Sequence, residues 1–240
     1  MDVSWEGLGW ERLGNGVGRR RLPVWDATAA LVAGADRALL FDTGSSLREG
    51  AELRSQTQRL LGRRVTHIAL SHPHFDHVLG TAAFAGAEVF GAVGLAALLR
   101  NGREELHSSA VRHGVPEHEA AEAVDVLVAP RHEVCGEWTL DLGGGLQVLL
   151  ADVGPGHSGH DLAVLVPGSP AVVFCGDLVE QSGEPQAGSD AVPSRWPAAL
   201  DRLLALGGEE AVYVPGHGAV VDAAFVRAQR DRLAARFGVS

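Results

Sequence analysis

The chain has 240 residues, of which 46% are hydrophobic and 21% are charged, a composition typical of a folded globular protein rather than a disordered or fibrous one. Its 30 acidic residues exceed its 20 lysines and arginines, so the formal net charge is −10. This charge repels phosphate backbones and anionic membrane surfaces, and we therefore expect neither nucleic acid nor membrane as a partner.

Short apolar runs bounded by Gly, Pro or Asp recur along the chain and predict buried strands. In chain order these runs are 38–41, 65–70, 88–90, 126–128, 147–150, 162–166, 171–175 and 212–214. Segments of helical character are interleaved with them, at 46–61, 95–100, 117–123, 195–206 and 219–236. This interleaving predicts an α/β chain.

Two of the predicted strands, 162–166 and 171–175, are joined by a Pro-Gly-Ser-Pro turn and are expected to form a hairpin. Antiparallel pairing there disfavours a purely parallel, doubly wound sheet. The polar segment 102–119 fits either a solvated helix or an insertion facing the substrate, and the short basic run 19–21 is expected to be solvated.

The number of cysteines and the N-terminal residues indicate the cellular compartment in which the protein is expected to act. Cys135 and Cys175 are too few for a disulfide framework or a Cys-rich zinc site. No basic segment followed by an apolar stretch marks a signal peptide at the N-terminus. We therefore expect a cytoplasmic protein with one domain over residues 1–240; the oligomeric state is not indicated by the sequence.

Four residues that can bind metal lie within the six positions 72–77, just after the predicted strand 65–70: His72, His74, Asp76 and His77. Residues two apart in extended chain point the same way, so His72 and His74 can bind one ion. Asp76 falls where a helix is expected to begin, and capping that helix is its alternative role. The density of the cluster favours metal binding.

Three further candidates follow or end apolar runs at tight turns: His157 in Gly-Pro-Gly-His-Ser, Asp177 in Phe-Cys-Gly-Asp, and His217 in Val-Pro-Gly-His-Gly. Functional side chains are common on the loops of a rigid sheet. A lone histidine of this kind is usually structural, but three such turns together with the cluster at 72–77 favour a shared site.

These motifs, in this order, resemble those of the metallo-β-lactamase superfamily. The resemblance covers most of the chain and implies a four-layer αβ/βα sandwich of two mixed β-sheets flanked by helices. It also includes Phe41-Asp42-Thr43-Gly44, whose Asp in that family supports the site without binding metal.

The resemblance implies a binuclear centre with a ligand set like that of glyoxalase II and lactonase enzymes. His72, His74 and His157 correspond to the first site. Asp76, His77 and His217 correspond to the second, and Asp177 to the carboxylate that bridges the ions. Imidazole and carboxylate ligands without a thiolate suit two Zn²⁺ ions and also admit iron or manganese.

The function expected from this set is hydrolysis of an ester-like bond, a thioester, lactone or amide, in a small organic substrate by a metal-bridging hydroxide. Asp76 and Asp177 are the expected catalytic carboxylates. Three alternatives stay open: a phosphodiesterase acting on a small substrate, an iron-dependent oxidoreductase such as a persulfide dioxygenase, and a binding protein that only retains the fold. The roles of His160 and Trp25 are not fixed by the sequence.

Overall fold

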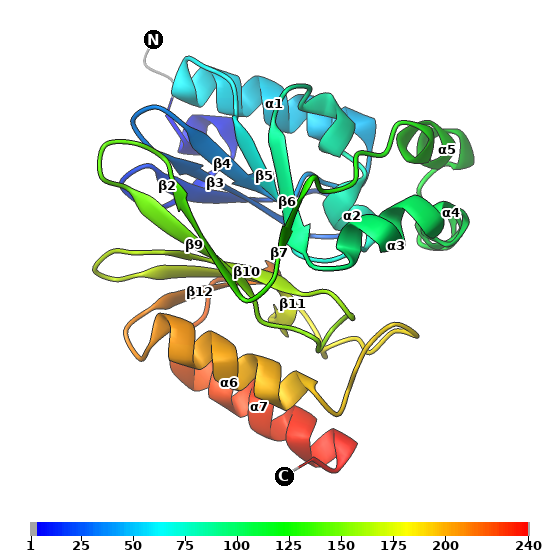
Figure 1. The fold of residues 1–240 in the computed structure, drawn as a ribbon, viewed down its shortest axis with the longest axis vertical. Helices are drawn as coiled ribbons and strands as arrows, with labels where there is room; N and C mark the ends of the chain where they lie inside the picture. Colours follow the sequence, from blue (N-terminus) through cyan, green and yellow to red (C-terminus); the bar gives the residue numbers. More distant parts are fainter. Residues whose placement is uncertain (1–3, 240) are drawn as a thin grey trace.

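A computed structural model describes residues 4–239 as two β-sheets packed face to face between two layers of helices (Figure 1). The seven-stranded sheet has the order β1-β2-β3-β4-β5-β6-β7, and the five-stranded sheet has the order β12-β11-β10-β9-β8. Helices α1, α3, α4 and α5 lie outside the first sheet, and α6 and α7 lie outside the second.

The elements have the following bounds. The strands are β1 Glu11–Gly14, β2 Val17–Arg21, β3 Thr28–Ala33, β4 Ala38–Phe41, β5 His67–Ala69, β6 Glu88–Ala92, β7 His132–Val134, β8 Glu137–Asp141, β9 Gln147–Asp152, β10 Leu162–Val166, β11 Val172–Glu180 and β12 Val212–His217. The α-helices are α1 Leu47–Leu61, α2 Phe75–Val78, α3 Leu95–Asn101, α4 Arg103–Arg112, α5 Glu117–Asp125, α6 Trp196–Gly207 and α7 Ala223–Phe237.

Both sheets are mixed. Strands β1 to β4 pair antiparallel and β4 to β7 pair parallel. In the second sheet β8 to β11 are antiparallel, and β12 adds parallel to β11. The expected hairpin of β10 and β11 is confirmed, as is the expected four-layer α/β sandwich of two mixed sheets.

Side-chain alternation along the strands separates three hydrophobic layers. Leu39 and Phe41 of β4 point between the sheets, where the Phe41 ring stacks on Phe174 of β11 with centroids 5.8 Å apart. Leu40, between them, points outward into the layer that contains Leu53 of α1. Trp196 of α6 is buried in the third layer, against the outer face of the second sheet. A period of two residues places successive side chains on opposite faces, so β4 serves two layers at once.

One predicted strand is wrong. Residues 126–128 follow α5 as irregular chain, and Val126 and Val128 are 50% and 37% exposed. The edge position of the first sheet is instead occupied by β7, so this short apolar run has no strand to pair with.

The expectation that the basic run 19–21 is solvated is wrong for Arg19, although Arg21 is exposed. Arg19 lies in β2 and is 3% exposed, and its guanidinium donates to Glu11 Oε2 and to the Gly218 carbonyl. Gly218 directly follows His217, so this buried side chain ties the N-terminal strands to the end of β12.

Across residues 4–239, no helix combines the length and apolarity needed to cross a bilayer.

Candidate metal centre

The seven predicted ligand residues gather where several strands end at one edge of the sandwich. The segment 72–77 follows β5 and includes the start of α2, while Asp177 and His217 lie in the last parts of the parallel strands β11 and β12. His157 lies in the turn between β9 and β10. Strands β5, β11 and β12 thus end at the same place, which is why residues distant in sequence can share one site.

Two groups of potential ligand atoms form, each within 4.8 Å: one of His72, His74, His157 and Asp177, the other of Asp76, His77 and His217. Helix α2 begins at Phe75, and its N-cap residue is His74, which makes no capping hydrogen bond. Asp76 is therefore not the N-cap, and the capping alternative is wrong. Its carboxylate instead faces the second group.

Asp177 lies between the two groups. Its Oδ2 is 3.6 Å from His72 Nε2 and 3.4 Å from His157 Nε2 in the first group. The same carboxylate lies 3.3 Å from the Nε2 atoms of both His77 and His217 in the second. Of the seven residues, Asp177 is thus in contact distance of histidines from both groups.

Several inward-facing atoms of this cluster are buried without a hydrogen-bond partner. They are His72 Nε2, His77 Nε2 and Asp177 Oδ1. Buried polar atoms in folded proteins are almost always paired, so unpaired ones that converge on one point need an explanation. Cations held between imidazole nitrogens and carboxylate oxygens would satisfy them, and these residues fit a pair of zinc-like ions.

The outer nitrogens of the histidines in the second group are anchored. His77 Nδ1 donates to Asp42 Oδ2 at 2.9 Å, and His217 Nδ1 donates to the carbonyl of Trp25 at 2.7 Å. Asp42 is itself buried and accepts a hydrogen bond from the Ser71 amide at 2.8 Å. These bonds leave Nε2 of each ring free toward the centre, the arrangement that metal-binding histidines require.

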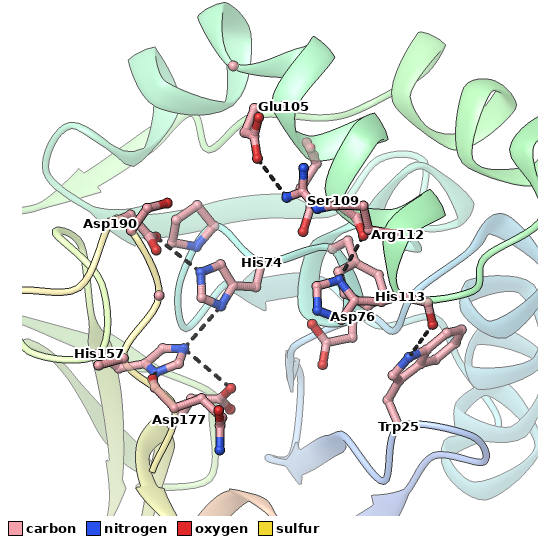
Figure 2. A pocket seen from close by; sticks show the side chains of 18 of the residues that line it. Trp25, His74, Asp76, Glu105, Ser109, Arg112, His113, His157, Asp177 and Asp190 are labelled. Carbon is pink, nitrogen blue, oxygen red and sulfur yellow. Dashed lines mark hydrogen bonds and ion pairs between the residues drawn. The ribbon is translucent and has the colours of Figure 1, made fainter.

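The first group is anchored in part by the loop between β11 and α6. His157 Nδ1 donates to the Gln186 carbonyl at 3.1 Å, and His74 Nε2 donates to Asp190 Oδ2 at 3.0 Å. His74 Nδ1 then lies 3.0 Å from His157 Nε2 (Figure 2). Two rings of this group are therefore oriented by one loop, a feature that no motif in the sequence indicated.

Burial and charge act on the imidazoles in opposite directions. Burial lowers the pKa of His157 to about 4 and holds that of His72 well below its ordinary value. Burial also acts to lower the pKa of His217, but the Asp177 and Asp76 carboxylates outweigh it and raise that pKa to about 12. The carboxylates of Asp76 and Asp177 therefore stabilise positive charge at the second group when no metal is bound.

We expect Asp42→Asn to weaken metal binding by about ten- to a hundredfold, because the amide cannot accept from both the His77 ring and the Ser71 backbone as the carboxylate does. Competition with a chromophoric zinc chelator measures the affinity. The exposed Asp36→Asn is the matched control. Unchanged affinity in Asp42→Asn would show that Asp42 does not support the centre.

Glycine is required next to the shared carboxylate. A Cβ at Gly216 would overlap Asp177 Oδ1 and lie 2.8 Å from the carbonyl carbon of Gly176. We expect Gly216→Ala to displace Asp177, so that bound metal falls below that of the wild type and activity drops at least about tenfold. Gly159→Ala is the control, because a Cβ there meets nothing within 4 Å. Metal content and activity are measured for both purified variants. If Gly216→Ala matched Gly159→Ala in both quantities, the steric argument would be contradicted.

A pocket of about 620 Å³, a size suited to a small molecule, opens over the cluster. Five of the seven candidate ligand residues line it: His74, Asp76, His157, Asp177 and His217. Trp25 forms part of its wall and packs edge-on against Phe75 with centroids 5.4 Å apart. Helix α4 contributes a second part of the wall, so the segment 102–119 does face the pocket. His160 is not among the lining residues described; its Nδ1 bonds the Val93 carbonyl at 2.8 Å.

Residues 22–217 match the family model described as the metallo-beta-lactamase superfamily. Two proteins called metallo-beta-lactamase domain-containing protein 1 are also similar. The one from Xenopus laevis is 29% identical over 197 residues, covering 80% of this chain and 71% of that protein. The one from Rattus norvegicus is 31% identical over 209 residues, covering 84% of this chain and 70% of that protein.

Solved structures share the fold. A metallo-beta-lactamase from Pontibacter korlensis superposes with a TM-score of 0.71 at 22% identity, covering 93% of this chain and 97% of that one. The mono-zinc form of a metallo-beta-lactamase from Pseudomonas aeruginosa gives 0.69 at 19% identity, covering 96% of each chain. At these identities the likeness shows the fold alone.

Proposed function

The chain belongs to the metallo-β-lactamase superfamily, and from that membership we propose that it is a binuclear metal-dependent hydrolase of an ester-like bond, a thioester, lactone or amide, in a small organic substrate. The single observation that supports this most is the convergence of unpaired buried imidazole and carboxylate atoms on two adjoining sites that share Asp177.

We propose two Zn²⁺ ions as the natural occupants, with iron or manganese as the other metals that this ligand set accepts. His72, His74 and His157 would hold one ion, Asp76, His77 and His217 the other, and Asp177 both. Cys175 is buried in the layer between the second sheet and α6 and belongs to neither group, so no thiolate enters the set. Metal ions held there would lower the pKa of a bound water molecule to near neutrality and would polarise the oxygen of the bond under attack.

The protein's own contribution is placement and proton handling. The imidazole rings are fixed by hydrogen bonds on their outer nitrogens, so the centre is organised before substrate arrives. Asp76 lines the pocket beside His217, with its Oδ2 3.4 Å from the Nε2 of that ring. Its carboxylate is thus positioned to hold a proton that passes to the leaving group.

Pocket size and net charge support a small substrate over a polynucleotide. The pocket volume is in the range of pockets that bind small molecules, and the chain carries ten more acidic than basic residues. We accordingly propose that the protein acts in the cytoplasm on a small molecule and that it binds neither nucleic acid nor membrane.

The test combines metal analysis with substrate turnover. Protein purified without added metal is assayed for zinc, iron and manganese, and then for cleavage of thioesters, lactones, β-lactams and phosphodiesters. We expect zinc and a chelator-sensitive activity on an ester-like bond, lost in His74→Ala. Because one structural neighbour is a mono-zinc form, activity must be measured against metal content. Stoichiometric iron with oxygen consumption, or activity unchanged by chelator and by His74→Ala, would contradict the proposal.

A further inference from the structure

Helix α4 presents a mixed face to the pocket. Residues three and four apart on a helix share one side, and Leu106, Ser109 and Arg112 all line the pocket from α4. Leu106 and the α3 residues Leu98 and Leu99 make part of this wall apolar. The rings of Phe75 and Trp25 also line the pocket. A substrate body lying along it is therefore an apolar chain or ring.

Arg112 is the one lysine or arginine among the described residues that line this pocket. Its guanidinium makes one contact to Glu105, at 2.9 Å from Nη2, and both side chains are largely exposed (Figure 2). A guanidinium has five N–H donors in a planar fork, so most of them remain available to an anion that enters the pocket.

The position of Arg112 is fixed by its neighbour in sequence. The His113 ring stacks on Phe75 with centroids 5.3 Å apart, and its carbonyl accepts a hydrogen bond from Trp25 Nε1 at 3.3 Å. Phe75 lies between the ligand residues His74 and Asp76. The end of α4 is therefore joined to the segment that carries the metal centre, and these contacts fix the backbone from which the Arg112 side chain extends.

The pocket's other carboxylates are engaged, so they do not compete for the guanidinium. Asp76 and Asp177 belong to the metal-ligand groups, and Asp190 accepts from His74. Glu180 accepts from the Ser182 amide and hydroxyl at 3.0 and 2.6 Å. Among residues 4–239, Glu105 is the one carboxylate that forms an ion pair with Arg112.

We propose that Arg112 binds the carboxylate of an amphipathic acid, whose apolar body lies along α3 and α4 and whose ester-like bond lies at the metal centre. This inference rests on the proposed hydrolase function and narrows its substrate class. The segment 102–119, which the sequence left open between a solvated helix and a substrate-facing insertion, is then the part of the chain that determines specificity.

The test is a binding experiment that needs no turnover. Calorimetry on the metal-loaded protein compares 4-phenylbutyrate with its uncharged amide, 4-phenylbutyramide. We expect the wild type to bind the acid roughly tenfold more tightly than the amide, the scale of one charge-assisted hydrogen-bond pair. Arg112→Ala should reduce this preference to below about threefold, and Arg112→Lys should leave an intermediate value because the planar fork is lost.

Glu105→Gln gives the opposite sign. Removing the anion that competes for Arg112 should strengthen binding of the acid by about two- to fivefold, an effect that mere structural support by Arg112 would not produce. The exposed Arg100→Ala on α3 is the matched control and should keep the wild-type preference. Circular dichroism and metal content verify that each variant is folded.

The inference would be overturned if the wild type bound neither probe or showed no preference for the acid. It would also be overturned if Arg112→Ala kept the preference, because the metals would then hold the carboxylate. Absence of any ester hydrolysis by the wild type contradicts the proposed function instead. The two failures are therefore distinguishable.

Discussion

Asp177→Asn should lower turnover of the best substrate by about a hundred- to a thousandfold, the loss that accompanies removal of one preorganised electrostatic contact in an active site. The substitution keeps the volume of the side chain but removes its charge. Asp177 is the residue that lies within 3.6 Å of His72, His77, His157 and His217 together. We therefore expect bound metal to fall from two ions per chain toward one, measured by elemental analysis beside the activity assay.

Asp201→Asn provides the control for this substitution. Asp201 is an exposed residue of α6 that pairs with Arg230 at 3.1 Å, and surface pairs of this kind contribute little. Its variant should match the wild type in metal content and turnover. An Asp177→Asn protein that retains two ions and full activity would remove the central support for a shared carboxylate.

The sequence was sufficient to identify the candidate metal centre because its residues follow or end strongly apolar runs beside glycine and proline. Strand β5 places the segment 72–77, and Asp177 and His217 lie in the last parts of strands β11 and β12. Parallel strands that end at the same edge then bring these residues together. Local pattern thus specifies distant contacts when the strands themselves are unambiguous.

The residues that orient the ligands could not be predicted in the same way. Asp190 lies in the irregular chain between β11 and α6, and its hydrogen bond with His74 joins positions 116 residues apart. Gln186 and Trp25 act through backbone carbonyls, which every residue possesses, so the sequence carries no signal for them. Arg19 resembled a solvated basic run because its buried partner, the Gly218 carbonyl, is equally silent in the sequence.

The sequence did not predict strands β1 and β2, and it left α4 open between a solvated helix and an insertion, for a compositional reason. Strand β2 contains three consecutive arginines, and α4 contains polar residues on most of its surface, so neither shows a clear apolar period. Strand β2 is fixed instead by pairing with β1 and β3. Only Leu106 and Ala110 of α4 are buried, in the hydrophobic layer outside the first sheet, so the apolar pattern of this helix is weak although its position is well defined.

Removal of the metals should lower the midpoint of thermal unfolding by about 8–16 °C. A ligand present at roughly a thousand times its Kd stabilises the folded state by about 4 kcal/mol, and each kcal/mol shifts the midpoint of a protein of this size by about 2–4 °C. The physical source is the cluster of unpaired buried atoms, which bound cations would satisfy. Differential scanning calorimetry of the chelated and the zinc-reloaded protein measures the increment.

The increment should also grow as the pH rises from about 6 to 8. In the metal-free protein, Asp177 and Asp76 overcome the effect of burial and raise the pKa of His217 to about 12, so its proton must be displaced by metal. A pKa raised on folding stabilises the metal-free protein most below the ordinary histidine pKa of about 6.5 and loses that effect only toward pH 12. Low pH therefore both favours the metal-free protein and weakens metal binding. Magnesium is the control, because imidazole ligands do not suit it and it should give no increment. An equal rise with zinc and magnesium, or one independent of pH, would mean that the ions stabilise some other part of the molecule.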